Sequence, residues 1–285
     1  MGDFLIIIMS HGRAEKLKTF YSLGKQGYTG EIVILVDDTD EQADRYIADF
    51  NGLDKVSVEV FNKQEIIDQS DICDNFDLGY KTGIFARNAS WNVAKKYGYQ
   101  YFLVLDDDYS GFEYMLPNEG WHYHIKDLDA IFGIYFEYLK NCPQITSIAM
   151  SQAGDYIGGR NNQLYLNPYA KRKCMNSWFC DTEREFWFFG RLNGDTNTYT
   201  ALGHRGKVFL QMPFNSVNQT VTQRSDGGIT SLYKTLGTYV KSFYTVMITP
   251  SCSDIRLMGD KDPRLHHNIK WNNTVPKIIS HTLKK

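Results

Sequence analysis

Residues 99–112 read YQYFLVLDDDYSGF, and the rest of the chain can be interpreted outward from them. The apolar part, residues 101–105, has the length and composition of a buried β-strand. It runs directly into three adjacent aspartates, Asp106, Asp107 and Asp108. Neighbouring carboxylates repel one another, so a cluster at the end of a buried strand requires a positive charge close to it.

Three earlier apolar segments, 3–10, 31–38 and 56–61, also have the character of buried strands. Helical patterns over 13–27, 40–50 and 83–99 alternate with them. This alternation predicts an α/β fold whose mostly parallel sheet is covered on both faces by helices. Ligands of such sheets bind beyond the carboxyl ends of the strands. The acidic pairs or clusters that follow two of these strands, Asp37–Asp38 and Asp106–Asp108, are therefore expected at a binding edge.

The second half of the chain is less regular. A helix is expected at about 126–141 and a strand at 145–151, whereas residues 152–225 are rich in Gly, Asn, Tyr, Trp and Thr. That composition favours irregular structure and antiparallel strands, and residues 227–248 are expected to end in a helix and a strand. Without a repeat or linker, one domain over 1–285 is the simplest interpretation. In it, residues 1–110 form a regular half and residues 111–285 are shaped around a second ligand.

The composition narrows the class of protein. With 285 residues, 42% of them hydrophobic, the chain can bury a full core, and disorder is not expected. A net charge of −2 excludes a strongly basic nucleic-acid coat but leaves room for a local basic groove. Five cysteines without a C-x-x-C pattern fit a reducing cytoplasm better than a disulfide framework. The apolar start is too short for a membrane span and lacks a basic signal region, so we expect a cytoplasmic protein without a membrane partner.

A divalent cation would relieve the repulsion within the aspartate cluster, because Mg²⁺ and Mn²⁺ prefer carboxylate oxygens and leave positions for phosphate. Strand alternation would place Asp106 and Asp108 on one side and Asp107 on the other. Three other interpretations compete. A solvated acidic turn stays open, and a Ca²⁺ loop fails because its twelfth position is Pro117. A phosphatase with an Asp nucleophile is weakened by the α/β segment of about 100 residues that precedes the motif.

Residues 86–108, ARNASWNVAKKYGYQYFLVLDDD, resemble the nucleotide-sugar half of GT-A glycosyltransferases, and the resemblance extends over about residues 3–110. It implies a GT-A-like, Rossmann-like sheet and a nucleotide-sugar donor, UDP-linked, held with Mn²⁺ or Mg²⁺. Asp106 and Asp108 would face the metal. The residues implied to lie near the donor are Ser10, His11, Arg13, Asp37, Asp38, Arg87, Asn88, Asp106 and Asp107.

Two later segments also resemble this family. Residues 190–210 are similar to the acidic segment of inverting GT-A enzymes, which implies that Asp195 is the catalytic base, although Gly194 stands where many relatives have Glu. A helix N-cap is an equally good interpretation of Asp195. In the tail RLHHNIKW, the resemblance implies a histidine ligand for the metal, either His267 or His266. Adjacent residues of an extended strand face opposite ways, so only one of them is expected to ligate, and His267 is favoured.

The Trp- and Phe-rich segments of the second half resemble the phage TET-associated glycosyltransferases, which act on hydroxymethylated pyrimidines in DNA. The resemblance implies that a base leaves the stack for reaction and that basic and aromatic residues contact the DNA. A solvated basic turn beside core aromatics is the competing interpretation. The implied acceptor-binding residues are Arg160, Lys171, Arg172, Lys173, Trp178 with its neighbour Phe179, and Trp187.

The expected function is therefore a metal-dependent transfer of a sugar from a nucleotide-diphosphate sugar to a hydroxyl, the hydroxymethyl group of a modified pyrimidine in phage DNA. The site of action would be the cytoplasm of the host. The alternatives are the same chemistry on a saccharide, lipid or protein acceptor, a D-x-D phosphatase, and a non-catalytic nucleotide-sugar-binding module.

Overall fold

A computed structural model of the chain describes residues 4–75, 82–116, 123–156, 161–166, 171–219, 230–258 and 263–276. Within these ranges the first four strands are parallel neighbours in the order β3-β2-β1-β4. Their bounds are β1 (Phe4–Met9), β2 (Ile32–Asp37), β3 (Val56–Phe61) and β4 (Tyr101–Asp106). They match the predicted apolar segments closely, and the predicted α/β class is confirmed.

The sheet continues past β4 as a mixed sheet, so the expectation of a mostly parallel sheet holds only for its first half. Beside β4 lie in turn β8 (Trp178–Asp181), β7 (Ile145–Gln152), β9 (Val208–Gln219), β5 (Tyr109–Tyr114) and β6 (Tyr123–His124). In this half only β7 and β9 pair in parallel, among the described strands. Residues 152–225, where irregular structure and antiparallel strands were expected, contribute the two central strands β8 and β9, which make antiparallel pairs with β4, β7 and β5.

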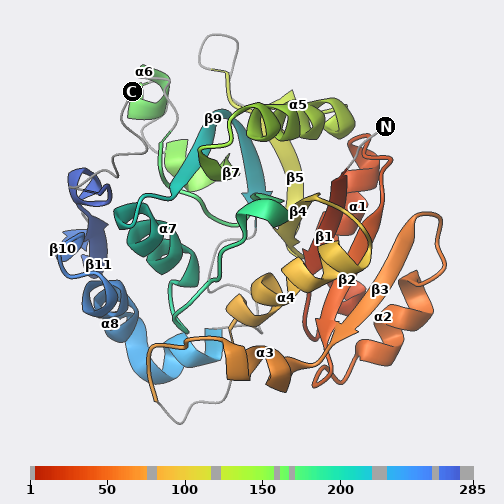
Figure 1. Cartoon of the computed structure of the whole chain (residues 1–285), viewed down its shortest axis with the longest axis horizontal. Coiled ribbons are helices and arrows are strands. Elements are labelled where there is room, and N and C mark those ends of the chain that lie inside the picture. The colour runs from red at the N-terminus through yellow and green to blue at the C-terminus, as the bar shows by residue number, and fades with distance from the viewer. Residues whose placement is uncertain are drawn as a thin grey trace.

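Helices cover both faces of the sheet (Figure 1). Their bounds are α1 (Lys18–Lys25), α2 (Ala43–Phe50), α3 (Lys63–Gln69), α4 (Ile84–Lys96), α5 (Leu128–Asn141), α6 (Gln163–Leu166), α7 (Gly194–His204) and α8 (Thr230–Ile248). Short 3₁₀ turns occupy Ala14–Lys16, Ala153–Tyr156, Thr182–Arg184 and Trp271–Asn273. Helix α8 continues through Ile248, where a strand had been expected, with non-helical backbone at Gly237. A separate hairpin, β10 (Ser253–Met258) with β11 (Arg264–Ile269), follows α8.

The continuous apolar sequence of β1 is explained by burial on both faces. Leu5, Ile7 and Met9 pack into the cluster under α4, while Phe4, Ile6 and Ile8 pack into the cluster under α5. Fully burying one such side chain contributes about 1.5–3 kcal/mol to stability. The two layers fix the parallel strands in register, so their carboxyl ends lie at one edge. No described helix is long and apolar enough to cross a membrane.

Candidate active site

The turn after β1 connects the acidic ends of β2 and β4. Its His11 Nδ1 lies 2.8 Å from Asp37 Oδ2 at the end of β2, and Lys63 Nζ lies 3.3 Å from the other carboxylate oxygen. Burial alone would raise the pKa of Asp37, but the hydrogen bonds with His11 and Thr39 and the charge of Lys63 lower it below its usual range. The same hydrogen bond raises the pKa of His11. Asp38 is exposed and accepts a hydrogen bond from the Lys63 backbone.

Asp107 points into the protein, opposite to the side expected for a ligand. Its oxygens accept hydrogen bonds from Ser10 Oγ (2.6 Å) and Arg13 Nη1 (2.9 Å). Tyr46 of α2 completes this network through its hydroxyl, which lies 2.6 Å from Ser10 Oγ. Burial raises the pKa of Asp107, and the Arg13 charge opposes that rise. Ser10 and Asp107, both predicted near the donor, thus fasten β1 to β4 and α2 from inside.

Asp106 faces α4 and the second half of the chain. Its Oδ1 lies 3.3 Å from Nη2 of Arg87, whose side chain is 12% exposed. The Arg87 guanidinium also lies over the ring of Phe188, 5.6 Å from its centroid. Burial would lower the pKa of Arg87, but the charges of Asp106 and Asp195 raise it. Arg87 is therefore paired with the strand-end carboxylate and also feels the charge of the predicted catalytic base.

Asp108 is the member of the cluster that lacks a direct partner in the described part of the chain, although the charges of Arg13 and Lys18 act on it. Among the described residues it has neither a hydrogen-bond partner nor an ion pair. Burial, followed by the charges of Asp106 and Asp107, raises the pKa of Asp108 to about 6. The cluster thus retains a need for positive charge after Arg13 and Arg87 have paired with its other two members.

Asp195 occupies the first turn of α7, and its charge acts on Arg87 of α4 and on Lys241 of α8. The helix is capped by Asn193, which adopts the left-handed conformation (φ 53°), so the alternative role of Asp195 as the N-cap is wrong. The Asp195 Oδ1 accepts a hydrogen bond of 2.7 Å from the Thr196 backbone. Gly194 is required here because a Cβ would lie 2.4 Å from Cγ2 of Ile84 in α4. This close approach accounts for glycine at position 194, where the resemblance to inverting GT-A enzymes implied glutamate.

The two tail histidines lie on the same side as Asp195. His267 Nδ1 is 3.4 Å from Asn193 Nδ2, and the same amide donates to the Lys241 carbonyl of α8 at 2.8 Å. Burial and the neighbouring His266 lower the pKa of His267 to about 4, against the opposing charge of Asp195. The rings of His266 and His267 are 4.3 Å apart, so the expectation that they face opposite ways is wrong. The His266 ring turns back onto its own strand, with Nδ1 2.6 Å from the His267 carbonyl.

Asn88, predicted near the donor, is a buried structural residue instead. It exchanges two hydrogen bonds with the Phe188 backbone, at 2.8 and 2.9 Å, and donates a third to Ser70 Oγ at 3.0 Å. Asn88 follows Arg87 directly in α4, and this one-residue step around the helix turns the Asn88 side chain toward the interior and away from the strand ends. The prediction for Asn88 is therefore wrong, but its bonds hold the segment whose Phe188 covers Arg87.

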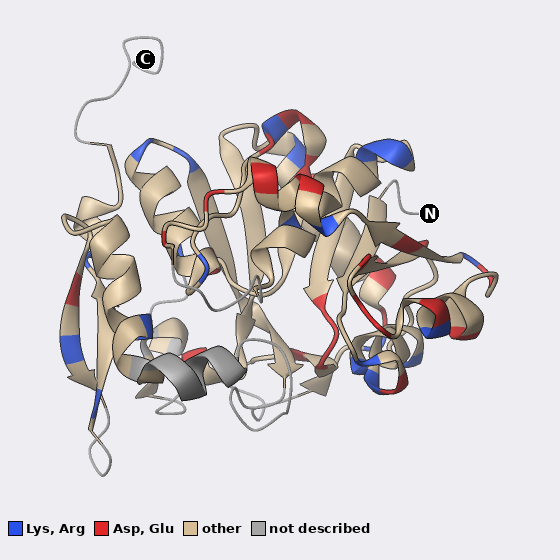
Figure 2. Ribbon diagram, turned by 90° about the horizontal axis from the view of Figure 1, so that it is seen from below, with Lys and Arg blue, Asp and Glu red and all other residues tan. Residues whose placement is uncertain are grey.

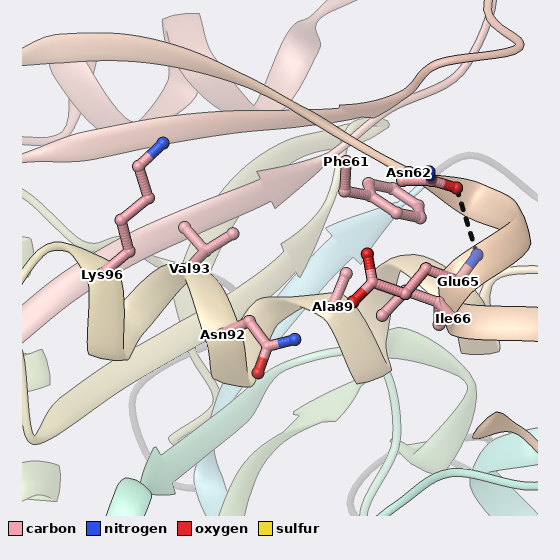
Figure 3. A pocket seen from close by; sticks show the side chains of 8 residues that line it. All are labelled: Phe61, Asn62, Glu65, Ile66, Ala89, Asn92, Val93 and Lys96. Atoms are coloured by element: carbon pink, nitrogen blue, oxygen red, sulfur yellow. Dashed lines mark hydrogen bonds between the residues drawn. The ribbon is translucent and has the colours of Figure 1, made fainter.

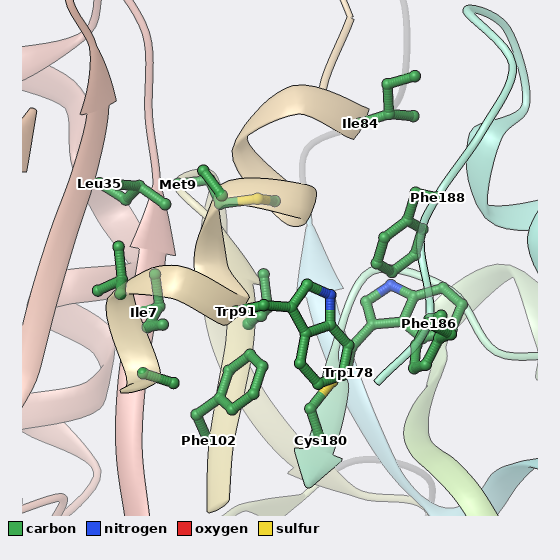
Figure 4. Packing of buried hydrophobic residues seen from close by; sticks show 14 of the residues in the cluster. Ile7, Met9, Leu35, Ile84, Trp91, Phe102, Trp178, Cys180, Phe186 and Phe188 are labelled. Atoms are coloured by element: carbon green, nitrogen blue, oxygen red, sulfur yellow. The ribbon is translucent and has the colours of Figure 1, made fainter. Parts of the chain in front are cut away.

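The prediction that Trp178 stacks on a base is also wrong. It is fully buried in β8, packed edge-on against Phe188 at 4.7 Å and near Trp91 in the cluster of Figure 4. Its neighbour Phe179 is fully buried on the opposite face of the sheet. Trp187 is partly exposed, and its Nε1 donates to Glu185 at 2.9 Å. Tryptophan enrichment here indicates a core.

The three residues of the basic run 171–173 all make contacts within the protein. Arg172 donates to the carbonyls of Trp271 and Thr274 and lies over the Trp271 ring, and Lys173 pairs with Asp155 at 2.5 Å. Lys171 bridges to Gln211 through its backbone. Arg160 lies outside the described residues. Figure 2 shows basic and acidic residues interspersed along the described ribbon.

The donor set at the edge fits a hard divalent cation in part. Asp106 and Asp108 supply carboxylate oxygens, and the crowding at Asp108 is what a divalent charge would relieve. Within the described ranges, no three His, Cys, Asp or Glu side chains are gathered as a complete metal site. The remaining ligands would therefore come from a bound diphosphate and water, as Mg²⁺ and Mn²⁺ sites commonly allow.

Two surface hollows lie away from these groups. The first, of about 200 Å³, lies beside α3 and α4 (Figure 3) and is lined by Phe61, Asn62, Glu65, Ile66, Ala89, Asn92, Val93 and Lys96. The second is lined by Tyr114, Tyr123, His124, Lys126 and Asp127. None of the predicted site residues lines either hollow, so the chemistry is assigned to the strand ends.

Three residues near the site were not predicted from the sequence. Phe188 covers Arg87, Asn193 joins α7 to α8 and β11, and Lys241 lies within the field of Asp195. Burial lowers the pKa of Lys241, and Asp195 opposes that effect. Only Asn193 carried a local signal, because Asn-Gly marks a turn. Phe188 and Lys241 come close to the site only through tertiary packing.

Comparison with known proteins identifies a family whose sequence model matches most of the chain. The sequence model of the family described as TET-Associated Glycosyltransferase matches residues 4–228. No curated protein matches the chain. Among solved structures, one match is GalNAc-T7 with UDP, GalNAc and Mn²⁺, at 14% identity and a TM-score of 0.43. That match covers 76% of this chain and 43% of the other, so the chain spans less than half the length of that protein. Another is a putative nucleotide-diphospho-sugar transferase from Desulfovibrio desulfuricans G20, at 9% identity and a TM-score of 0.40, covering 88% of this chain and 95% of the other.

Proposed function

The chain belongs to the TET-associated glycosyltransferase family, and we propose that it transfers a sugar from a UDP-sugar to the hydroxymethyl group of a modified pyrimidine in DNA, with Mn²⁺ or Mg²⁺ as cofactor. One observation carries the proposal. Asp108 lies in the same cluster as Asp106 without a hydrogen-bond or ion-pair partner among the described residues, and the Arg87 that pairs with Asp106 is also within the field of Asp195. This arrangement supports a metal-diphosphate subsite at the end of β4 with a base on α7.

In this reaction the acceptor oxygen forms a bond to the anomeric carbon as the bond from that carbon to the diphosphate oxygen breaks. The electron pair of the broken bond leaves with the nucleoside diphosphate. A carboxylate oxygen of Asp195 takes the proton of the acceptor hydroxyl, and attack from the opposite face inverts the anomeric centre. Asp195 suits this role because its Oδ1 is oriented by the Thr196 backbone at the start of a helix.

The growing charge on the leaving group would be matched by a bound divalent ion and by Arg87. Asp106 and Asp108 would hold the divalent ion, which supplies Lewis-acid stabilisation of the diphosphate. Arg87 is preoriented by Asp106 and by the ring of Phe188. His267, kept neutral by burial, is suited to offer a nitrogen ligand or a hydrogen bond. His11 and Asp38 are the more exposed polar groups at the β1 and β2 ends, where the nucleoside would lie.

The acceptor is assigned from the family, whose description links it to TET chemistry. A base presented for reaction at its hydroxymethyl group would leave the stack. The charges of Lys241 and Lys173 act on His267, so both provide positive charge near it, although Lys173 is also paired with Asp155. A second candidate is the same transfer to an uncharged acceptor, favoured by the intramolecular pairing of Arg172 and Lys173.

The test is incubation of the protein with UDP-sugars and Mn²⁺ on DNA containing 5-hydroxymethylcytosine or 5-hydroxymethyluracil. Mass spectrometry of the nucleosides is expected to show the mass gain of one sugar. The product should be lost in Asp108→Asn but kept in Asp44→Asn, which alters an exposed carboxylate of α2. UDP release without any sugar on the DNA would overturn the DNA acceptor and leave the second candidate.

A further inference from the structure

Arg87 combines three features that its assignment to the donor does not explain. It is nearly buried, at 12% exposure, and its Nε has no hydrogen-bond partner among the described residues. Within the described part of the chain, its one ion pair is with Asp106, at 3.3 Å, a length that is loose for a charge-assisted bond. A buried guanidinium normally uses its planar set of donors fully. Arg87 therefore has hydrogen-bond donor capacity that the described residues do not use.

The residues around Arg87 keep it charged and fix its position, but they do not occupy all of its hydrogen-bond donors. The Phe188 ring, held by the two hydrogen bonds of Asn88 to its backbone, lies against one face of the guanidinium. Asp106 pairs with it, and the charges of both Asp106 and Asp195 raise its pKa. An arginine with one loose ion pair and a spare donor can turn to a second anionic partner without losing all of its anionic contacts.

A divalent cation bound to Asp106 would compete with Arg87, because the carboxylate oxygen nearest the guanidinium is also a candidate metal ligand. Placing two cations against one carboxylate is repulsive in a buried setting. Leaving Arg87 buried without an anion would also be costly. A donor diphosphate removes both penalties, since it brings negative charge to the metal and to the released Arg87 at once.

We propose that Arg87 is a stand-in cation for the metal on Asp106, and that its release to the diphosphate makes metal and donor bind cooperatively. This inference rests on the proposed function, because it takes Asp106 as a metal ligand. It assigns Arg87 a second role besides contacting the donor. In the unliganded protein Arg87 holds the metal affinity down, so that the ion is retained well only together with the nucleotide.

The experiment measures Mn²⁺ binding by electron paramagnetic resonance, from the loss of the free-ion signal, with and without UDP. In Arg87→Gln, Mn²⁺ affinity without UDP is expected to rise by about 5-fold or more, the lower end of usual coupling factors. The factor by which UDP tightens Mn²⁺ binding, after allowance for chelation by free UDP, is expected to fall by a similar amount. The control is Arg205→Gln, an exposed arginine at the far end of α7, which should leave both values unchanged.

If Arg87→Gln does not fold, as judged by circular dichroism, Arg87→Lys carries the test. Lysine is a shorter point charge that pairs less well with Asp106, so Mn²⁺ affinity above that of the wild type supports the proposal. An affinity equal to or below the wild type in the folded variant overturns it. If the wild type binds Mn²⁺ neither alone nor with UDP, the proposed function fails as well. If the wild type binds Mn²⁺ with UDP and the variant gains nothing, only the role of Arg87 fails.

Discussion

Asp195 is the residue on which the chemistry depends most directly. Replacing it with Asn keeps an oxygen that can accept the Thr196 hydrogen bond, so α7 should start as before. The amide cannot take a proton from the acceptor, and loss of a general base typically costs about 10²–10⁴ in rate. We therefore expect kcat on modified DNA to fall by that factor with little change in the affinity for UDP and Mn²⁺. Transfer at the wild-type rate would show that the base lies elsewhere.

His11 makes a prediction about stability and pH. Its pKa is raised by the hydrogen bond with Asp37, so its contribution is present below the ordinary value of 6.5 and is lost as pH rises through the raised value. The pKa of Asp37 is lowered, so its contribution is present above the ordinary 3.8 and is lost as pH falls through the lowered value. Both contributions are present between those two ordinary values.

The urea midpoint of the wild type should therefore exceed that of His11→Gln most clearly between these two pH values, and the difference should shrink in alkaline solution. The effect should be modest, because half of the His11 side chain is exposed. A difference that grows steadily toward high pH would contradict the assigned pair.

At the level of single residues, the sequence predicted acidic positions better than aromatic or amide ones. Asp37 and Asp106 could be placed because a strand's apolar run fixes where its polar end must emerge. Asn88 and Trp178 could not, because residue type alone does not reveal which way a side chain turns. Asn88 is satisfied by the backbone of a segment 100 positions away, and Trp178 by a core shared with α4.

The contact between α4 and α7 sets the spacing between Arg87 and Asp195. In Gly194→Ala the new Cβ would meet Cγ2 of Ile84 at 2.4 Å, and overpacking of this kind costs about 1–3 kcal/mol. We expect a lower free energy of unfolding and a lower kcat, since α7 must move away from α4. Urea unfolding measures the first and steady-state kinetics the second.

Two further variants test whether the contact with Ile84 causes this effect. Adding Ile84→Ala should remove most of the further cost of Gly194→Ala, as a double-mutant cycle would show. Gly133→Ala in α5, where a Cβ meets nothing within 4 Å, should instead stabilise the protein slightly. Equal effects of Gly194→Ala with and without Ile84 would exclude the contact as the cause.

The elements of the parallel half were predictable because each is long, apolar and bounded by turns. Helix α3, at seven residues, and the short strands β5 and β6 were missed. Residues 152–225 were expected to hold irregular structure and antiparallel strands, but neither the bounds of β8 and β9 nor their central place in the sheet was predicted. Their pairing is long-range and partly bulged, at Met150/Ser151 among other places, and no local pattern encodes such contacts.

For the molecule as a whole, the DNA acceptor predicts a salt effect. Net charge is −2, so any attraction to DNA has to come from local charge such as Lys173 and Lys241. Each phosphate contact contributes a slope of about −0.7 to −0.9 in the logarithm of affinity against that of salt. We expect kcat/KM for modified DNA to fall steeply with added salt while UDP binding changes little. A flat dependence would point to an uncharged acceptor.

In the proposed site, the carboxylates ending β4 hold a divalent ion that in turn binds the donor diphosphate. Calorimetric titration of UDP-sugar into the protein, with and without Mn²⁺, measures this coupling. We expect binding that needs Mn²⁺ and that weakens by at least about tenfold in Asp108→Asn, the loss of about 1.4 kcal/mol or more. Binding that is indifferent to Mn²⁺, or unchanged in Asp108→Asn, would contradict it.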